Sequence, residues 1–389
     1  MTNKLRQYFP MIHTRQEVLA EIEAKPKLKQ EFYSWKKNYR KEFLNFCTGV
    51  KGVKIMYDFI SKEILNPETV PERVEELLSL LIGQQVHIKE VLPNDGTRIS
   101  DESTLVIMDM VVELEDGSIV NLEVQKIGYK FPGARSACYS ADLLLRQYKK
   151  VRSKKGKKFN YTDVKDVYTI VLFEKSPTEF HEFPDTYIHY FEQHSNTGIQ
   201  LNLLQKYLFI SIDIFLKYQQ NIGIQLETRR DAWLAFMGSD NPDIILKVIE
   251  KYPDFKEMYQ QVYEICQNIE EVMGMFSKEL AEMDRNTAQL MIDEMQEDIK
   301  QKEEILKGQD DRIKDQINKL KEQDDRLKEQ DDRLKEQDDR LKEQDDRLKE
   351  QDDRLKEQDD RLKEQDDRLK EQDQVIRELM KKIEQLENK

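Results

Sequence analysis

The sequence contains few of the residues that form disulfide frameworks or zinc sites. Among 389 residues there are only three cysteines, Cys47, Cys138 and Cys266, which are too scattered for either purpose. The five histidines never recur at a metal-ligand spacing such as HxxxH. We therefore expect a reduced, cytoplasmic compartment in which the cysteines fill the core.

Long apolar runs are also missing. No stretch is apolar for the ~18 residues that a membrane-spanning helix needs, and Met1 is not followed by a signal-like apolar core. The sequence thus predicts neither membrane insertion nor export. Aromatic residues, at 9% with 16 Phe, favour a folded protein, and the first ~280 residues are long enough to bury at least one core.

A perfect repeat fills much of the C-terminal part. The motif KEQDDRL recurs seven times without variation from Lys321 to Leu369. Each copy has two basic and three acidic residues, so the seven copies contribute −7, half of the net charge of −14. The total charge therefore says little about the rest of the chain, where local basic patches matter more.

This repeat is a heptad. Fourteen consecutive positions at seven-residue intervals, from Ile292 to Ile383, are apolar, but the second seam position is Gln in every repeat. Such a thin seam predicts a helix, from about Leu280 to Leu386, that depends on acid-first charge pairs such as Asp324 with Lys328. Two interpretations remain open: a coiled coil through which the chain self-associates, or a soluble lone helix.

We expect four parts along the chain. These are N-terminal helices over residues 1–50, a core of strands and helices over 51–215, a helical segment that packs on this core over 216–278, and the long helix over 279–389. Within the core, one helix is predicted over Ala134–Lys150. The predicted strands are Val86–Val91, Leu105–Leu114, Ser118–Gln125, Val167–Phe173, Tyr187–Phe191 and Tyr207–Ile212.

The most informative segment is a predicted hairpin over residues 105–126. A three-residue loop that ends at Gly117, in the left-handed conformation, sets the register and places Asp109 opposite Glu123. One face of the hairpin is then apolar throughout and must be buried. A two-residue turn at Asp116 and Gly117 is the alternative, and it would turn Asp109 away from Glu123.

The polar face of this hairpin predicts a metal site. Two carboxylates that face each other across strands repel, and an Asp inside an apolar run is costly to ionise. A divalent cation held by Asp109 and Glu123 resolves both problems, since oxygen ligands suit Mg²⁺ or Mn²⁺. A solvated polar face is the alternative interpretation.

The chain resembles the PD-(D/E)XK nuclease family transposases, bacterial proteins related to the recombination-promoting nucleases. The resemblance is carried by the hairpin, LVIMDMVVELEDGSIVNLEVQK, by the preceding GVKIMYDFISKEILNPE and by the later MGMFSKELAEMDRNTAQLMIDEM. It extends from about Arg6 to about Asp298. It implies a restriction-endonuclease-like core of the α/β (α+β) class, in which helices flank a central mixed sheet, and DNA cleavage that depends on Mg²⁺ (or Mn²⁺).

The resemblance also implies roles for the hairpin residues. Asp109 is the motif aspartate, and Glu123 with Gln125 stands for the (D/E)xK pair, so Gln125 would orient the attacking water in place of a lysine. Lys126 is adjacent but should point to the opposite face. Lys62 or Lys130 is then the candidate substitute for the motif lysine.

Further matches to the family lie outside the hairpin. Asp58 and Lys62 match a D-x-x-x-K element of the family's first core helix. Arg135, Tyr139 and Gln147 match the R…Y…Q helix that follows the hairpin. We expect Asp58, Lys62, Lys126 and Gln147 to support the site.

The segment after the hairpin is the most basic part of the chain. Arg135, Tyr139 and Arg146 share one helical face, and KKVRSKKGKK follows as an expected flexible loop beside the site. These residues would hold DNA phosphates, although a merely solvated loop is the alternative. The expected DNA contacts are Arg135, Tyr139, Arg146, Lys149, Lys150 and Arg152.

Taken together, the sequence predicts a Mg²⁺-dependent DNA endonuclease of a transposase or recombination-promoting type. Asp109 and Glu123 would bind the metal, and Gln125 would complete the catalytic set. DNA and a second copy, bound through the C-terminal helix, are the expected partners, and a membrane is not. The rival hypothesis is a degenerate relative without nuclease activity, which binds DNA or oligomerises through the coiled coil.

Overall fold

The computed structural model describes residues 3–93, 110–126 and 132–387, so two predicted site residues, Asp109 and Lys130, lie outside it. The chain divides into two compact units, Met1–Glu297 and Asp298–Lys389. In the first unit, buried apolar side chains from Leu5 to Leu280 form one continuous core. The predicted segments 1–50, 51–215 and 216–278 therefore all contribute to the same core.

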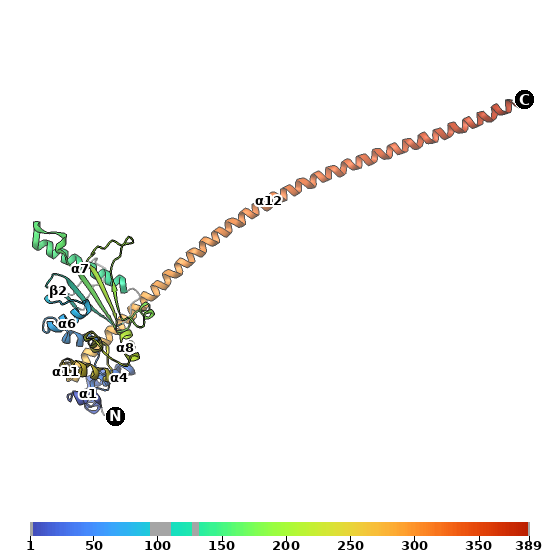
Figure 1. Ribbon diagram of the computed structural model, residues 1–389. Helices are drawn as coiled ribbons and strands as arrows, with labels where there is room; N and C mark the ends of the chain where they lie inside the picture. The colour runs from blue at the N-terminus through green and yellow to red at the C-terminus, as the bar shows by residue number, and fades with distance from the viewer. Residues whose placement is uncertain (1–2, 94–109, 127–131, 388–389) are drawn as a thin grey trace. The chain divides into compact units, whose positions relative to one another are not determined.

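The first unit contains a six-stranded mixed sheet (Figure 1). Its strand order is β1-β2-β3-β4-β6-β5, in which β3, β4 and β6 are parallel to one another and the remaining pairs are antiparallel. This is the central mixed sheet that the resemblance implies. The strands are β1 Ile88–Val91, β2 Met110–Leu114, β3 Ile119–Gln125, β4 Val167–Phe173, β5 Ile188–Phe191 and β6 Gln205–Ser211.

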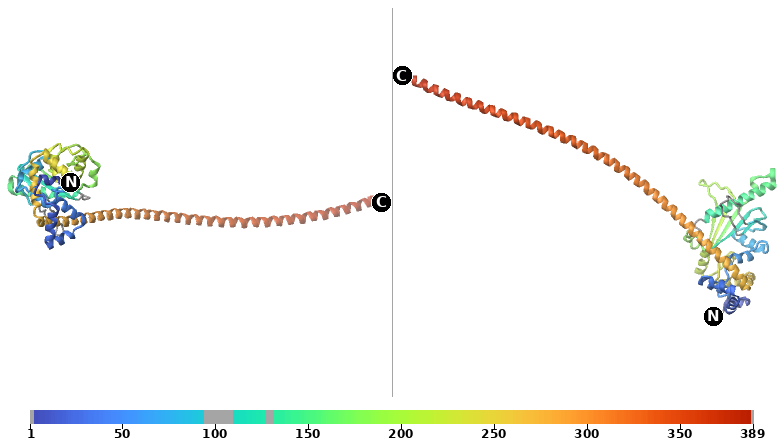
Figure 2. Two further views of the ribbon diagram at one scale, coloured as in Figure 1. Left: turned by 90° about the horizontal axis from the view of Figure 1, so that it is seen from below. Right: turned by 180° about the vertical axis from the view of Figure 1, so that it is seen from behind.

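Helices cover both faces of the sheet. One face, with most of the helices, forms the main core, and α7 lies on the other face (Figure 2). There α7 packs through a smaller apolar cluster around Tyr139 and Leu143. The helices are α1 Lys4–Tyr8, α2 Arg15–Ala24, α3 Pro26–Ser34, α4 Lys37–Cys47, α5 Asp58–Ile64, α6 Pro71–Ile82, α7 Pro132–Lys155, α8 Ile212–Asn221, α9 Arg229–Gly238, α10 Pro242–Lys251, α11 Phe255–Ile265 and α12 Ile269–Glu387. Short 3₁₀ turns are η1 Gly156–Lys158, η2 Tyr161–Asp163 and η3 Thr178–Glu182.

Local sequence signals explain where these helices begin. Thr14 and Thr228 each form a capping box at the start of α2 and α9, which satisfies backbone N–H groups that have no partner within the helix. Proline occupies the first position of α3, α6 and α10, where its missing N–H costs nothing. Each helix then buries its apolar stripe against the sheet or its neighbours.

The hairpin has the register that its loop predicts. Met110 pairs with Leu122 and Val112 with Val120, and the backbone N–H of Leu114 donates to the Ser118 oxygen at 2.8 Å. Gly117 has φ +88°, the left-handed conformation that a three-residue loop requires. The three-residue loop is therefore confirmed, and the two-residue turn is wrong.

Helix α7 is longer than predicted. It continues past Lys150 to Lys155, so most of KKVRSKKGKK is helix and the expected flexible loop is wrong. After Gly133 in its first turn, α7 contains no Gly or Pro before Gly156, which has φ +51°, and basic side chains in a last turn interact favourably with the helix dipole. The cations of this segment are therefore held on a rigid element.

Helix α12 begins earlier than the predicted Leu280. Asn268 accepts a hydrogen bond from the Glu271 backbone N–H at 3.1 Å, as an N-terminal cap does. The first turns then bury Ile269, Met273 and Phe276 in the core of the first unit. Tertiary packing, rather than the heptad repeat, therefore starts this helix.

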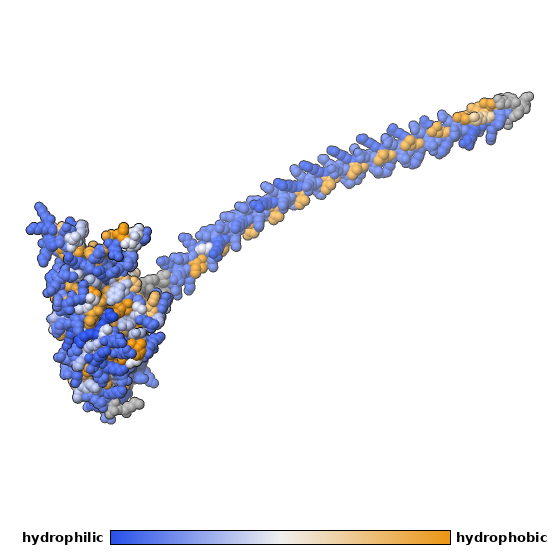
Figure 3. Space-filling view, in the orientation of Figure 1, coloured by the Kyte–Doolittle hydropathy of each residue, from blue (hydrophilic) through white to orange (hydrophobic). Residues whose placement is uncertain are grey.

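The second unit is helical throughout its described length, up to Glu387. In each of the seven repeats, one Asp pairs with the Lys four residues later at 2.8–3.9 Å, which confirms the predicted charge pairs. The repeat leucines are 61–62% exposed. Figure 3 shows them as separate apolar patches along a hydrophilic rod.

Candidate active site

The strand β3 separates two kinds of side chain. Asn121, Glu123 and Gln125 point toward α7, whereas alternate residues such as Leu122 belong to the main core on the other face. The three polar side chains are nevertheless buried, with 0%, 4% and 5% of their surface exposed. A buried row of polar groups is costly to fold, so it points to chemistry rather than to packing.

Glu123 is held by a cation from α7. The guanidinium of Arg135 lies 3.2 Å from the Glu123 carboxylate, and it also stands over the ring of Tyr139 at 5.2 Å. Tyr139 is itself only 6% exposed, so its ring supports Arg135 from within the protein. The structure thus joins a predicted metal ligand, Glu123, to two predicted DNA contacts.

Other polar atoms on this face are buried and unsatisfied. Within the described residues, the Gln125 amide oxygen, both polar side-chain atoms of Asn121 and the hydroxyls of Thr169 and Ser211 have no hydrogen-bond partner. Thr169 pairs with Asn121 across β3 and β4, so these two side chains lie side by side. Each such group costs about 1–3 kcal/mol, which marks the face as one prepared for a bound species.

These donors fit a hard divalent cation. The Glu123 carboxylate is an oxygen ligand of the type that Mg²⁺ and Mn²⁺ prefer, and the amide oxygen of Gln125 on the same face can accept a hydrogen bond from a water molecule beside such an ion. The second expected ligand, Asp109, lies outside the described residues, but the strand pairs next to it have the register that was predicted to oppose it to Glu123. Among the described residues, no group of three or more Asp, Glu, His or Cys side chains could hold a metal.

A separate ionic cluster lies on the opposite face of β3. The Lys126 ammonium contacts Asp58 at 2.7 Å and also binds the Glu279 carboxylate, which accepts the Asp58 backbone N–H at 3.0 Å. Lys62 reaches Asp58 at 3.8 Å. The structure therefore brings Asp58, Lys62 and Lys126 together, but on the side away from Glu123 and Gln125.

Burial makes this cluster electrostatically tight. Desolvation raises the pKa of the Glu279 carboxyl, although Lys126 opposes that shift. Burial disfavours the charged form of Lys126, but the neighbouring carboxylates outweigh it and raise its pKa. Sequence reasoning missed Glu279; its position between Phe276 and Leu280, on the apolar stripe of α12, was the available signal.

Gln147 supports the hairpin rather than the chemistry. Its amide nitrogen donates to the Gly117 oxygen at 2.9 Å, and its amide oxygen accepts the Lys165 backbone N–H at 2.7 Å. It therefore fixes the turn before β3 to the loop before β4. This turn lies at the end of β3 opposite to Gln125.

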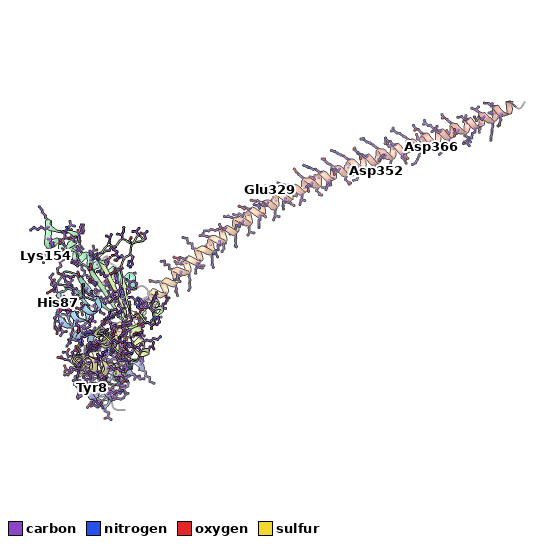
Figure 4. All side chains as sticks on the ribbon, viewed as in Figure 1. Tyr8, His87, Lys154, Glu329, Asp352 and Asp366 are labelled. Carbon is purple, nitrogen blue, oxygen red and sulfur yellow. The ribbon has the colours of Figure 1, made fainter. Side chains whose placement is uncertain are left out.

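The same contact locates the basic segment. Arg135 meets Glu123 toward the end of β3 and Gln147 meets the turn before it, so α7 runs away from the site. The cations after Gln147 are thus at the far end of α7, where Figure 4 labels Lys154, and the expectation of a basic loop beside the site is wrong. A continuous helix rises about 1.5 Å per residue, which forces this separation.

Several of the expected DNA contacts already have acidic partners. The Arg146 guanidinium pairs with Asp142 at 2.8 Å. Lys150 bridges Glu90 and Glu113, at 2.7 Å from each, and with Lys89 it holds the pKa of Glu113 below its usual range despite burial. Arg152 hydrogen-bonds the Tyr148 hydroxyl, while Lys149 is exposed and has no ion pair in the part of the chain that is described.

Comparisons with known proteins give one result. The family model for the PD-(D/E)XK nuclease family transposases matches residues 55–291, which is more than half of the chain and includes the whole sheet. No curated protein and no solved structure matches the chain. Over the described residues, no helix is both long and apolar enough to cross a membrane.

Proposed function

This chain belongs to the PD-(D/E)XK nuclease family transposases, and on that premise we propose that it is a metal-dependent endonuclease that hydrolyses DNA phosphodiester bonds. The family supports a nuclease or transposase type of function. The observation that carries the finer proposal is the buried carboxylate of Glu123 near the buried amide oxygen of Gln125, which has no partner among the described residues, on one face of β3.

The residues of this face have distinct roles in the proposal. Asp109 and Glu123 hold Mg²⁺ or Mn²⁺, and the ion, when bound, would polarise a scissile phosphate and lower the pKa of a water molecule. The amide oxygen of Gln125 accepts a hydrogen bond from that water and orients it. Because an amide does not take up a proton, Gln125 positions the water but does not act as its base.

Arg135 connects the site to the DNA backbone. Its side chain is 38% exposed although it pairs with the buried Glu123, so it lies at the boundary between the site and solvent. A cation at this boundary can exchange its carboxylate for a phosphate when DNA arrives. We therefore assign Arg135 to binding the phosphate next to the scissile bond.

The test is cleavage of supercoiled plasmid by the purified full chain with Mg²⁺. Asp109→Ala should abolish nicking, because it removes a metal ligand. Glu113→Gln is the matched control, since Glu113 is also a buried acid of this hairpin but is neutralised by Lys89 and Lys150. If the wild type does not nick, or if Asp109→Ala nicks at the wild-type rate, the proposal is wrong.

One observation favours the rival function, a DNA-binding relative without catalysis. The ion pair between Arg135 and Glu123 neutralises the buried acid without any metal. If this pair is the permanent state of the site, the protein should show no Mn²⁺ affinity and no thermal shift with Mn²⁺. A nuclease should bind Mn²⁺ and melt at a higher temperature in its presence, so a Mn²⁺ titration separates the two functions.

We propose further that the second unit makes the protein a homo-oligomer. Its repeat leucines are about 61% exposed in a single chain, and their seven-residue period supports pairing with another helix. Light scattering on the full chain and on a chain ending at Lys300 tests this. A lower subunit number for the shorter chain is expected; equal numbers would show that the helix is a lone rod.

A cytoplasmic location also belongs to the proposal. It rests on the scarcity of cysteines, of which Cys47 and Cys266 are buried thiols and Cys138 is an exposed thiol. Fractionation of cells that produce the protein, with thiol alkylation of Cys138, would test it. Recovery of the protein outside the cytoplasm would contradict it.

A further inference from the structure

The outer end of α7 concentrates positive charge. The segment from Tyr148 to Tyr161, which we call the α7 tip, carries seven Lys or Arg residues and no acid in a chain with net charge −14. Lys150 and Lys155 pair with acids, Lys155 with Asp163 at 2.5 Å. Within the described residues, the remaining cations have no ion pair; these are Lys149, Arg152, Lys154, Lys157 and Lys158. Such uncompensated charge favours a polyanion as ligand.

An aromatic cluster stands among these charges. The rings of Tyr148 and Tyr161 are nearly parallel, 11° apart with centroids at 6.1 Å, and Phe159 meets them edge-on at 5.5 and 5.3 Å. Tyr161 is nevertheless 74% exposed. A solvated basic helix needs no such ring, whereas aromatic rings among cations are what single-stranded nucleic acid stacks on.

The backbone under Tyr161 is fixed. Asn160 and Asp163 form a reciprocal capping box at η2, in which the Asn160 backbone N–H donates to Asp163 at 2.9 Å. Asp163 also holds Lys155 of α7, so the turn is tied to the helix. The ring therefore offers a prebuilt surface that loses little entropy when a base stacks on it.

The ligand at the tip must offer exposed base faces. In a duplex these faces are covered by neighbouring bases, so only unpaired nucleotides present them. We propose that the α7 tip is a second DNA-binding site, at which unpaired bases stack on Tyr161 and the surrounding lysines hold their phosphates. The proposal rests on DNA being the substrate of the site around Glu123.

The length of α7 sets the distance between the two contacts. From Arg135 to Tyr148, the residue on which Tyr161 stacks, the helix rises about 20 Å, at 1.5 Å per residue. This corresponds to roughly six base pairs of duplex at 3.4 Å each. The structure thus favours a substrate with an unpaired stretch about half a helical turn away from the bond that is cut.

Binding of a fluorescent 20-nucleotide oligothymidine to the full chain in EDTA tests the proposal without any cleavage. Tyr161→Ala should weaken this binding by roughly 5- to 150-fold, the range for loss of one stacked base, and Tyr161→Phe should retain it. Leu145→Ala is the matched control, because Leu145 is an exposed apolar side chain of the same helix. Blunt duplex of 12 base pairs should bind both Ala variants as it binds the wild type.

Charge is tested separately from stacking. Replacing Lys154, Lys157 and Lys158 by Gln should lower the salt dependence of oligothymidine binding by about 2 in the log–log slope, at roughly 0.7 per phosphate contact. Wild-type affinity in Tyr161→Ala, an equal loss on blunt duplex, or no oligothymidine binding at all would overturn the proposal. Tighter binding of oligouridine than of oligothymidine would overturn the choice of DNA.

These outcomes are independent of catalysis. If Tyr161→Ala loses oligothymidine while plasmid nicking is absent, the second site stands and the nuclease assignment fails. If nicking depends on Asp109 while Tyr161→Ala binds oligothymidine normally, the nuclease assignment stands and the second site fails.

Discussion

The two faces of β3 are both buried, yet one carries apolar side chains and the other carries polar ones. Toward the main core, Val120 and Leu122 pack among apolar neighbours. Toward α7, Asn121, Glu123 and Gln125 are covered just as well, but Asn121 and Gln125 have polar atoms without partners in the described part of the chain. One face stabilises the fold, and the other reduces stability in exchange for a prepared site.

The largest effect is expected on the rate of DNA cleavage when the carboxylate of the polar face is removed. Glu123→Gln should slow plasmid nicking by at least about 10³-fold, because a metal's electrostatic contribution amounts to several kcal/mol. The melting temperature should not fall, since the substitution removes a buried charge. Nicking assays and thermal melts on the same preparations check this. A variant whose melting temperature falls while its nicking rate is unchanged would mean that this face serves stability and not chemistry.

The next effect concerns the ionic cluster at the end of the core face. Lys126→Met should destabilise the protein by about 3–5 kcal/mol, because it leaves the buried Glu279 without its cation. The double variant Lys126→Met with Glu279→Gln should recover most of that loss. Urea unfolding measures both, and equal stability of the single and double variants would contradict the role of this pair.

The same variant should be sensitive to pH. Burial already raises the pKa of Glu279 above its usual 4.5, and without Lys126 the pKa rises further. A raised carboxyl pKa favours the folded state at low pH, and this advantage is lost as pH rises through the folded-state pKa. The deficit of Lys126→Met should therefore grow from acidic to neutral pH; a deficit that shrinks would be contrary to this assignment.

A substitution in the main core measures how much the apolar face of β3 contributes to the free energy of unfolding. Leu122→Ala should cost about 2–5 kcal/mol of unfolding free energy, from lost burial and the cavity that remains. Its nicking rate, measured well below the melting temperature, should change little because Leu122 points away from the site. A stability loss below about 1 kcal/mol would mean that this face contributes less than its burial indicates.

The smallest effect should have the opposite sign. Asn121→Leu, a substitution of similar volume on the polar face, should leave stability unchanged or raise it by about 1 kcal/mol, since it removes a buried polar group that has no partner in the described segments. Urea unfolding next to Leu122→Ala makes the comparison direct. Loss of stability comparable to that of Leu122→Ala would show that both faces serve packing alike.

Local signals in the sequence were sufficient for the hairpin. Gly117 specified the loop, the loop specified the register, and alternation then assigned each side chain of β3 to its face. The expectation that Lys126 would point away from Gln125 followed from the same alternation. All six strands were also found, because short apolar runs between turn residues are a local property.

The remaining features depend on contacts between distant segments. Glu279 meets Lys126 across 153 positions, and no periodicity in either segment indicates that pairing. The end of α7 was missed because a run of lysines resembles a loop in composition, whereas packing of the earlier turns carries the helix onward. The wrong expectation that the basic segment lies beside the site followed from this single error.

The most direct measurement of the central claim is Mn²⁺ binding to the full chain by titration calorimetry, without DNA. The wild type should bind Mn²⁺ with an affinity that Asp109→Asn and Glu123→Gln each abolish, while Glu113→Gln leaves it intact. Absence of Mn²⁺ binding in the wild type, or binding that both variants retain, would contradict a metal site between these two acids.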